Sequence, residues 1–245
     1  FKINNYTDLW HLNQMVDAWN FRYKKSPTVV IPNLIDAQAD RRFAKDQSSG
    51  LKLVCKFLNG LNANFKIFHP HNAEVVEALM GNVEIIDNSE FIHRVLDEIC
   101  TDEDLLTLMS SDAGGFKPLS KLCDTITWKG EMYSAAKARS WDEKDGTKFV
   151  QQIDRQDFEG KDILIIDDIS VYGGTFKGLS KLLRERNCGK LYLAVSHMTV
   201  QNLGDDPVTN YFDKVFTTNS KYDDYYTMVQ EEKVRPKSLE IIKLW

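Results

Sequence analysis

The stretch Ile163–Phe176, ILIIDDISVYGGTF, contains a hydrophobic strand, two acidic residues, a short loop with two glycines and the start of a helix. In a parallel α/β sheet, ligands bind beside the loops that follow the carboxyl ends of strands. The Gly-Gly-Thr sequence lets backbone N–H groups approach an anion, and the start of the helix adds partial positive charge. Asp167 and Asp168 suit ribose hydroxyl groups or a Mg²⁺ ion. A plain strand–turn–helix connection with a solvated acidic pair would also explain this stretch.

Outward from this stretch, apolar runs of strand length alternate with segments of helical period. Such alternation is typical of parallel sheets joined by crossover helices. We therefore expect an α/β protein with two lobes, residues 1–88 and 89–245, each a mainly parallel sheet flanked by helices. The expected helices are 8–20, 51–61, 72–80, 91–100, 116–123 and 175–187, and the expected strands are 28–34, 65–68, 105–110, 132–138, 163–166 and 191–195. The polar segment Trp141–Gly146 is expected to be a mobile loop.

Composition narrows the class of protein. The 245 residues are 42% hydrophobic and 27% charged, which is typical of a globular chain. The net charge of −5 argues against a general nucleic-acid binder. No apolar run approaches the roughly 20 residues that cross a bilayer, so no membrane partner is expected. The four cysteines form no CxxC pair, which favours free thiols and a cytoplasmic location.

Six further motifs, in order along the chain, resemble those of the ribose-phosphate diphosphokinases. That family shares its phosphate loop with the type I phosphoribosyltransferases, and the other motifs favour the diphosphokinases. The resemblance covers nearly the whole chain and implies two phosphoribosyltransferase-type lobes. The first would lack its initial strands, and the last helix would pack on the first lobe. The motifs are IPNLIDAQADR at 31–41, FHPHN at 68–72, SSDAGG at 110–115, AKAR at 136–139, VSHM at 195–198 and TTNS at 217–220.

The resemblance implies transfer of the diphosphate of ATP to the 1-hydroxyl of ribose 5-phosphate, with release of AMP. Lys137 and Arg139 occupy the place of the family's catalytic basic strand, and the charged loop after them would act as a lid. Two residues apart on a strand, they would share one face. Two fixed cations stabilise charge that develops on the transferring group. Without the resemblance, a solvent-facing strand edge would explain this pair equally well.

The resemblance assigns ATP binding to the nucleotide segment and to the histidine after the second strand. His71 and Asp112 would hold Mg²⁺, although Asp112 also suits a helix N-cap. His69 stands where the family has aspartate, which alters one contact. Gln38-Ala39 replaces the family's Arg-Gln, so a charge near ATP is lost. The implied ATP residues are Gln38, Asp40, Arg41 or its neighbour Arg42, and His71.

The phosphate loop departs from the family pattern DTAGT, since Val171 and Tyr172 replace an aspartate and a threonine. Tyr172 offers a face on which a base could stack, unless it packs against the sheet. A larger acceptor, ADP-ribose, is therefore an alternative to ribose 5-phosphate, and its product would serve NAD rebuilding. The residues implied in binding the ribose phosphate are Asp167, Asp168, Tyr172, Gly173, Gly174 and Thr175.

Two other classes of function stay open at this point. A type I phosphoribosyltransferase would use the same loop to bind an activated sugar, but it gives no reason for AKAR, SSDAGG and FHPHN to occur together. A non-catalytic regulatory relative would not need to retain Lys137, Arg139, His71 and Asp112. The resemblance further implies a homo-oligomer and an enzyme that consumes the product.

Overall fold

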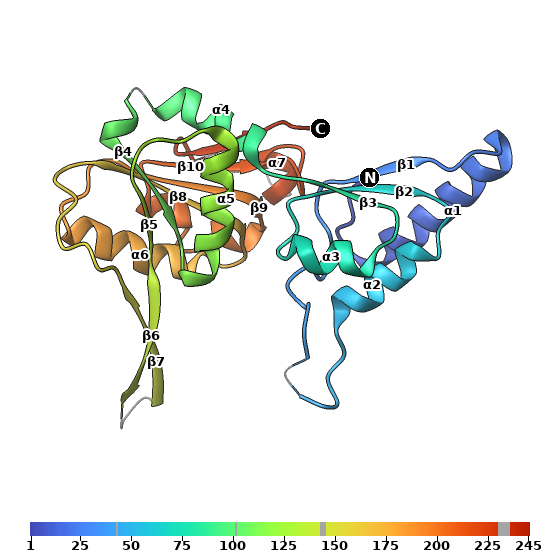
Figure 1. Ribbon diagram of the computed structural model, residues 1–245, viewed down its shortest axis with the longest axis horizontal. Helices are drawn as coiled ribbons and strands as arrows, with labels where there is room; N and C mark the ends of the chain where they lie inside the picture. The colour runs from blue at the N-terminus through green and yellow to red at the C-terminus, as the bar shows by residue number, and fades with distance from the viewer. Residues whose placement is uncertain (43, 101, 143–145, 230–235) are drawn as a thin grey trace. The chain divides into compact units, whose positions relative to one another are not determined.

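The computed structural model describes residues 1–42, 44–100, 102–142, 146–229 and 236–245 (Figure 1). The chain divides into two compact units. The first contains residues 1–88 together with 219–221 and 245, and the second contains residues 89–218 and 222–244. Among the described helices, none combines the length and the apolar character needed to span a membrane.

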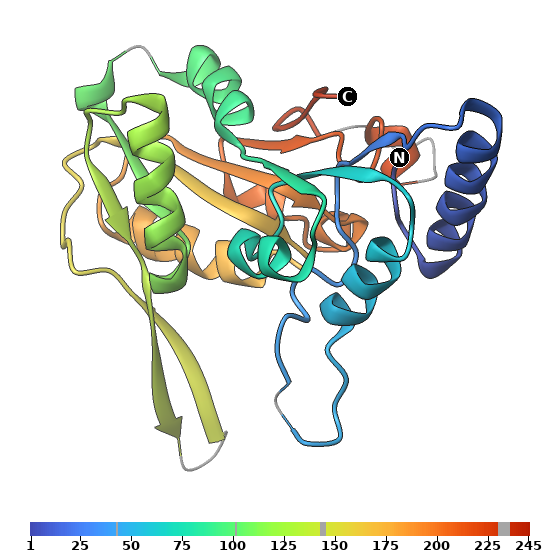
Figure 2. The same ribbon diagram turned by 45° about the vertical axis from the view of Figure 1, so that its right-hand side comes forward.

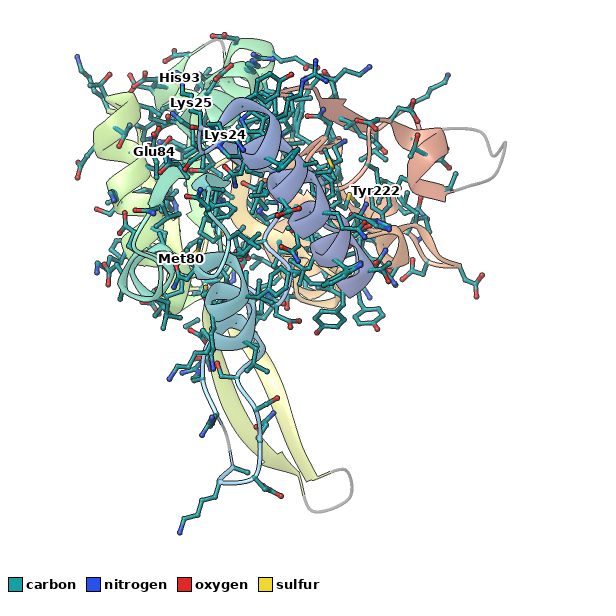
Figure 3. All side chains as sticks on the ribbon, turned by 90° about the vertical axis from the view of Figure 1, so that its right-hand side faces the viewer. Lys24, Lys25, Met80, Glu84, His93 and Tyr222 are labelled. Atoms are coloured by element: carbon teal, nitrogen blue, oxygen red, sulfur yellow. The ribbon has the colours of Figure 1, made fainter. Side chains whose placement is uncertain are left out.

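The first unit is a three-stranded parallel sheet in the order β1-β2-β3 with three helices. Its longest helix, α1, begins with a capping box between Asn5 and Asp8 and ends where Lys24 adopts a left-handed backbone with φ 51° (Figure 3). Buried residues of α1 and α2, such as Leu12 and Leu58, pack with Ile67 of β2 in one core. The elements are α1 (Tyr6–Tyr23), β1 (Thr28–Ile31), α2 (Gly50–Asn59), β2 (Asn64–Phe68), α3 (Ala73–Leu79) and β3 (Val83–Ile86).

The second unit is a six-stranded sheet in the order β11-β10-β9-β8-β4-β5, and all of its neighbouring strands pair in parallel. Each parallel connection needs a crossover, and helices supply most of them. The elements of the sheet and its helices are α4 (Ser89–Ile99), β4 (Leu106–Ser110), α5 (Phe116–Ile126), β5 (Met132–Ser134), β8 (Asp162–Ser170), α6 (Gly174–Glu185), β9 (Leu191–Met198), β10 (Lys214–Thr218), α7 (Tyr225–Val229) and β11 (Leu239–Ile242). Four single-turn 3-10 helices complete the unit: η1 (Glu103–Leu105), η2 (Ala113–Gly115), η3 (Val200–Leu203) and η4 (Val208–Tyr211).

The central strand β8 is buried on both faces of this sheet. Ile163 and Ile165 belong to the core cluster that contains Leu179 and Leu183 of α6. Leu164 and Ile166 point the other way, into the cluster formed with residues of α4 and α5. Side chains alternate along a strand, so an uninterrupted apolar run is what a strand covered on both sides requires. The polar end of β8 therefore emerges at one edge of a well-packed sheet.

A two-stranded antiparallel hairpin, β6 (Ala136–Asp142) and β7 (Gly146–Gln152), extends away from the six-stranded sheet (Figures 1 and 2). Residues 143–145 of the expected lid lie outside the described residues. Trp141, Asp142 and Gly146, expected in a mobile loop, belong to the strands instead, because cross-strand pairing continues through them. The single strand expected at 132–138 is also wrong: β5 pairs with β4, whereas residues from Ala136 onward pair with β7.

The expected α/β class, with parallel sheets flanked by helices, is confirmed. Three strands of the two sheets were not expected from the sequence, namely β3, β10 and β11. Helix α7 places Tyr225 and Met228 in the core of the second unit, and the expected packing of a last helix on the first lobe stays a prediction. A short strand, rather than a helix, then lies nearest the end of the chain.

Candidate functional site

The loop between β8 and α6 presents a helix N-terminus at the carboxyl edge of the second sheet. Gly173 is the N-cap residue, with φ 73° and ψ 2°, and its carbonyl accepts a hydrogen bond from the N–H of Lys177 at 3.0 Å. The first N–H groups of a helix have no acceptor within the helix, and they carry the positive end of its dipole. The local geometry is therefore suited to bind a phosphate group.

Glycine is present at the two positions of this loop for different reasons. At Gly173, a Cβ atom would lie 3.0 Å from both Asn202 Oδ1 and Val208 Cβ, in addition to the left-handed φ. At Gly174, a Cβ atom would meet nothing within 4 Å. The fold itself thus requires glycine at 173 but offers open space at 174. A ligand that approaches the backbone closely would account for the second glycine.

A buried asparagine that sequence reasoning missed holds the strand end that leads into this loop. Asn202 lies in η3 and is completely buried. Its amide nitrogen donates to the carbonyls of Ser170 at 2.8 Å and Val171 at 3.0 Å, and its oxygen accepts from the Ser170 hydroxyl. Thr199 also donates its hydroxyl hydrogen to the Val171 carbonyl. No sequence pattern signals this role, because Asn202 lies in a polar stretch without periodicity.

The acidic pair at the end of β8 is electrostatically strained. Burial, followed by the hydrogen bond and the charge of neighbouring Asp168, raises the pKa of Asp167 to about 7. Ser111 donates its hydroxyl hydrogen to Asp167 Oδ2, and the backbone N–H of Asp168 donates to Asp167 Oδ1 at 2.8 Å. The Asp167 carboxyl therefore holds a proton near neutral pH, and buried carboxyl groups with a raised pKa are common at functional sites.

Ser111 was not among the expected site residues, although its neighbours were. β4 pairs with β8 in a register that sets Ser110 beside Ile166, so the next residues along both strands, Ser111 and Asp167, meet at the same edge. Asp112 follows directly and caps η2, since its Oδ1 accepts from the N–H of Gly115 at 3.1 Å. The capping role expected for Asp112 is confirmed, and its role as a metal ligand stays a prediction.

The expected catalytic pair lies on the hairpin. Lys137 and Arg139 belong to β6, where their register partners are Gln151 and Phe149 of β7. The side chains of both residues lie outside the described part of the structure. Their assignment as catalytic cations therefore stays a prediction.

The expected ATP residues all lie in the first unit. Asn72, next to His71, donates its amide hydrogen to Asp40 Oδ2 at 3.3 Å, so the nucleotide segment and the FHPHN segment are adjacent. Arg41 stays close to the Asp40 carboxylate, with Nε 3.9 Å from Oδ1, and three quarters of its side chain is exposed. His71, Gln38 and Arg42 are exposed as well. The contacts bring Asp40, Arg41 and the His71 segment together, and the role of Gln38 stays a prediction.

Among the described residues, no three His, Cys, Asp or Glu side chains converge as a metal site. His71 and Asp112 lie in different units, and their joint role as ligands stays a prediction. The carboxylates of Asp112, Asp167 and Asp168 are nevertheless the oxygen donors that Mg²⁺ prefers, and that ion commonly takes its remaining ligands from water and substrate phosphates. The chemistry of these donors suits Mg²⁺, and its binding stays a prediction.

Tyr172 does not pack against the sheet, which excludes one of the two explanations considered for it. Its side chain is 71% exposed, next to the Gly173 turn. An exposed aromatic ring beside an anion site is unusual for a residue that serves packing alone.

Comparison with known proteins assigns the chain to a class. This chain belongs to the phosphoribosyl transferase domain family, whose profile matches residues 82–234. Within that class it is similar to two archaeal proteins named ribose-phosphate pyrophosphokinase. The Saccharolobus solfataricus protein is 25% identical over 71% of this chain, and the Sulfolobus acidocaldarius protein is 25% identical over 79%.

The matched segments span only 58% and 65% of the length of those two relatives. A crystal structure of phosphoribosylpyrophosphate synthetase from Mycobacterium smegmatis shares the fold, with a TM-score of 0.74 and 21% identity over 96% of this chain and 73% of that one. The resemblance to the ribose-phosphate diphosphokinases that the motifs indicated is thereby confirmed.

Proposed function

We propose that this protein transfers the diphosphate group of ATP to the 1-hydroxyl of ribose 5-phosphate, forming phosphoribosyl diphosphate and AMP. The relatives named ribose-phosphate pyrophosphokinase support this reaction. The observation that carries the proposal is the edge of the second sheet. There, Gly174 leaves open space beside a helix N-terminus, six residues after Asp168 of the acidic pair formed by Asp167 and Asp168.

In this proposal, the helix N-terminus and the acidic pair bind different parts of the acceptor. The N–H groups at the start of α6 and the Thr175 hydroxyl would bind the 5-phosphate. Asp167 and Asp168 would accept hydrogen bonds from the ribose hydroxyls, whose O–H groups are donors. Hydroxyl donors stabilise an ionised carboxylate, so binding of the ligand should lower the pKa of Asp167.

The donor side of the reaction is assigned by resemblance. Asp40, Arg41, Gln38 and His71 would bind ATP, and Lys137 and Arg139 would stabilise charge on the transferring group. The attacking hydroxyl needs alignment more than activation, because in phosphoryl transfer most of the rate enhancement comes from positioning and electrostatics. Mg²⁺, when bound, would neutralise phosphate charge, with Asp112, the acidic pair and His71 as its candidate ligands.

A second acceptor, ADP-ribose, is favoured by one specific observation, the exposure of Tyr172. In ADP-ribose the 5-phosphate carries an adenylate, and a base can stack on an exposed aromatic ring. Such stacking contributes about 1–3 kcal/mol, so Tyr172→Ala would weaken ADP-ribose use by about tenfold or more. Use of ribose 5-phosphate would be unchanged in that variant.

The test is AMP release from Mg-ATP with ribose 5-phosphate or ADP-ribose offered separately, and the mass of each product is read. A gain of one diphosphate on ribose 5-phosphate supports the proposal, and the same gain on ADP-ribose alone supports the second acceptor. Product formed only from an activated sugar and a base would indicate a phosphoribosyltransferase. No product in any arm would indicate a regulatory relative. Lys137→Ala should abolish turnover, whereas the control Lys129→Ala, at an exposed position, should not.

Self-association of the chain also stays a prediction. Helix α1 exposes more than half of the side-chain surface of several large apolar residues, namely Tyr6, Trp10 and Met15. Large exposed apolar residues are often part of an interface. Sedimentation of the wild type beside Trp10→Glu would reveal whether an oligomer forms and whether Trp10 contributes to it.

A further inference from the structure

Gln151, at the base of the hairpin, contacts the helix of the phosphate loop directly. Its side-chain Nε2 donates to the backbone carbonyl of Thr175 at 2.8 Å. Thr175 is the second residue of α6, two positions after the glycine N-cap. The contact therefore joins β7 to the same helical turn whose N–H groups form the phosphate site.

A second observation at the same contact comes from Gly178. It lies in the interior of α6, where glycine is one of the poorest helix formers. A Cβ atom at this position would lie 2.6 Å from Gln151 Oε1. The glycine thus leaves room for the Gln151 amide. The amide nitrogen donates to the Thr175 carbonyl, and the amide oxygen lies beside Gly178, so both atoms contact the first turns of α6.

The hairpin register connects this contact to the expected catalytic cations. Gln151 is the register partner of Lys137, and Arg139 lies two residues further along β6. The chain on either side of the hairpin is anchored independently, since Ala135 and Ile153 are buried in the core of the second unit. Arg186 also donates to the backbone carbonyls of Ile153 and Arg155. The fold of the unit therefore does not depend on the Gln151 side chain.

We propose that Gln151 is a positioning residue, whose amide ties the base of the hairpin to the helix of the phosphate loop. The strand carrying Lys137 and Arg139 is thereby held in a fixed relation to the phosphate site. The inference rests on the proposed function, because it takes these two residues as the cations that act on the transferring group. A residue that acts in this way changes turnover more than it changes binding of the acceptor.

The test compares four variants by AMP release and by thermal unfolding. Gln151→Ala removes the amide, and Gln151→Glu keeps its shape but has no hydrogen to donate to the Thr175 carbonyl. Gly178→Ala displaces the amide from the other side, since the group it would meet is the far end of a flexible side chain. Gln152→Ala is the matched control, because the next residue on the strand faces the opposite way and is exposed.

We expect each of the first three variants to lower kcat by about 10-fold to 100-fold, while KM for ribose 5-phosphate changes by less than about 2-fold. Gln152→Ala should leave both values unchanged. The double variant of Gln151→Ala with Gly178→Ala should be no slower than Gln151→Ala alone, because both changes break one contact. An unchanged kcat in Gln151→Ala, or losses that multiply in the double variant, would overturn the proposal.

A second measurement separates this inference from the proposed function. Hydrogen exchange of hairpin residues 136–142 and 146–152 is followed with and without ribose 5-phosphate, in the wild type and in Gln151→Ala. We expect the ligand to slow exchange in the wild-type hairpin but not in the Gln151→Ala hairpin. If the wild type releases no AMP, the proposed function fails while this coupling still holds. If the ligand slows hydrogen exchange of the hairpin equally in both proteins, the proposed link through Gln151 is wrong.

Discussion

Replacement of Asp167 by asparagine should stabilise this protein at neutral pH and impair its ligand site. Burial is the largest cause of the raised pKa of Asp167, and the hydrogen bond and charge of Asp168 follow. Asparagine is nearly the same size and carries no charge. Its carbonyl can still accept from the Asp168 N–H, and its amide can donate to the Ser111 hydroxyl, so the packing at the end of β8 is preserved.

The sign and the size of this stabilisation follow from the linkage between proton binding and folding. An unfolded chain ionises Asp167 near the usual value of 3.8, whereas the folded chain holds the proton until about pH 7. The folded state therefore binds more protons between these values, and stability falls as pH rises through this window. The interval between 3.8 and about 7 sets an upper limit of about 4 kcal/mol at pH 8. Because Asp168 shares the titration, we expect about 2 kcal/mol.

The assay is chemical denaturation of the wild type and Asp167→Asn between pH 4 and pH 8. The variant should match the wild type near pH 4 and exceed it by about 2 kcal/mol at pH 8. Asp154→Asn, at an exposed position, should not alter the pH dependence. A stability difference that is the same at both ends of the range would refute the reasoning, as would a variant less stable than the wild type at pH 8.

Three further predictions concern the phosphate loop and Asn202, which holds the strand end that leads into it. Gly173→Ala should lower the free energy of unfolding by about 2 kcal/mol, owing to its left-handed φ and the close contacts with Asn202 and Val208. Gly174→Ala should leave stability within about 0.5 kcal/mol of the wild type yet raise KM for ribose 5-phosphate by about tenfold or more; equal KM values would count against a phosphate beside that residue. Asn202→Ala should cost about 2–4 kcal/mol in denaturant unfolding, because the Ser170 and Val171 carbonyls lose their buried donor; a loss below about 1 kcal/mol would contradict this account.

The sequence predicted the elements whose signal is local. The run Ile163–Ile166 and the helical period after Thr175 mark β8 and α6, since burial on both faces leaves a continuous apolar strand. Strands β10 and β11 were not predicted from the sequence, because KVFTT and LEII are short and mixed in polarity. They become strands by pairing with a neighbour already in the sheet, which is a tertiary effect.

The residues of the candidate site also fall into those that the local sequence predicts and those that depend on tertiary structure. The acidic pair and the glycine loop were found because their chemistry is written in adjacent residues. Ser111 and Asn202 were missed because each reaches the site from another part of the chain, through strand register and through burial of η3. The raised pKa of Asp167 was equally beyond reach, since it depends on a desolvation that only the packed sheet produces.

Three residues near this edge lower the stability of their own segment, and each is explained by a group outside that segment. Asp167 holds a proton that an isolated carboxyl would lose, Gly178 weakens a helix interior, and Gly174 leaves space that the fold does not fill. The Gln151 amide accounts for Gly178 within the chain. Packing among the described residues does not account for the other two, and the proposed ribose phosphate would supply hydroxyl donors for the carboxylates and an anion for the helix N-terminus. Local sequence choices that work against folding are expected where a ligand completes the structure, so these two positions are the ones at which stability and function should separate most clearly.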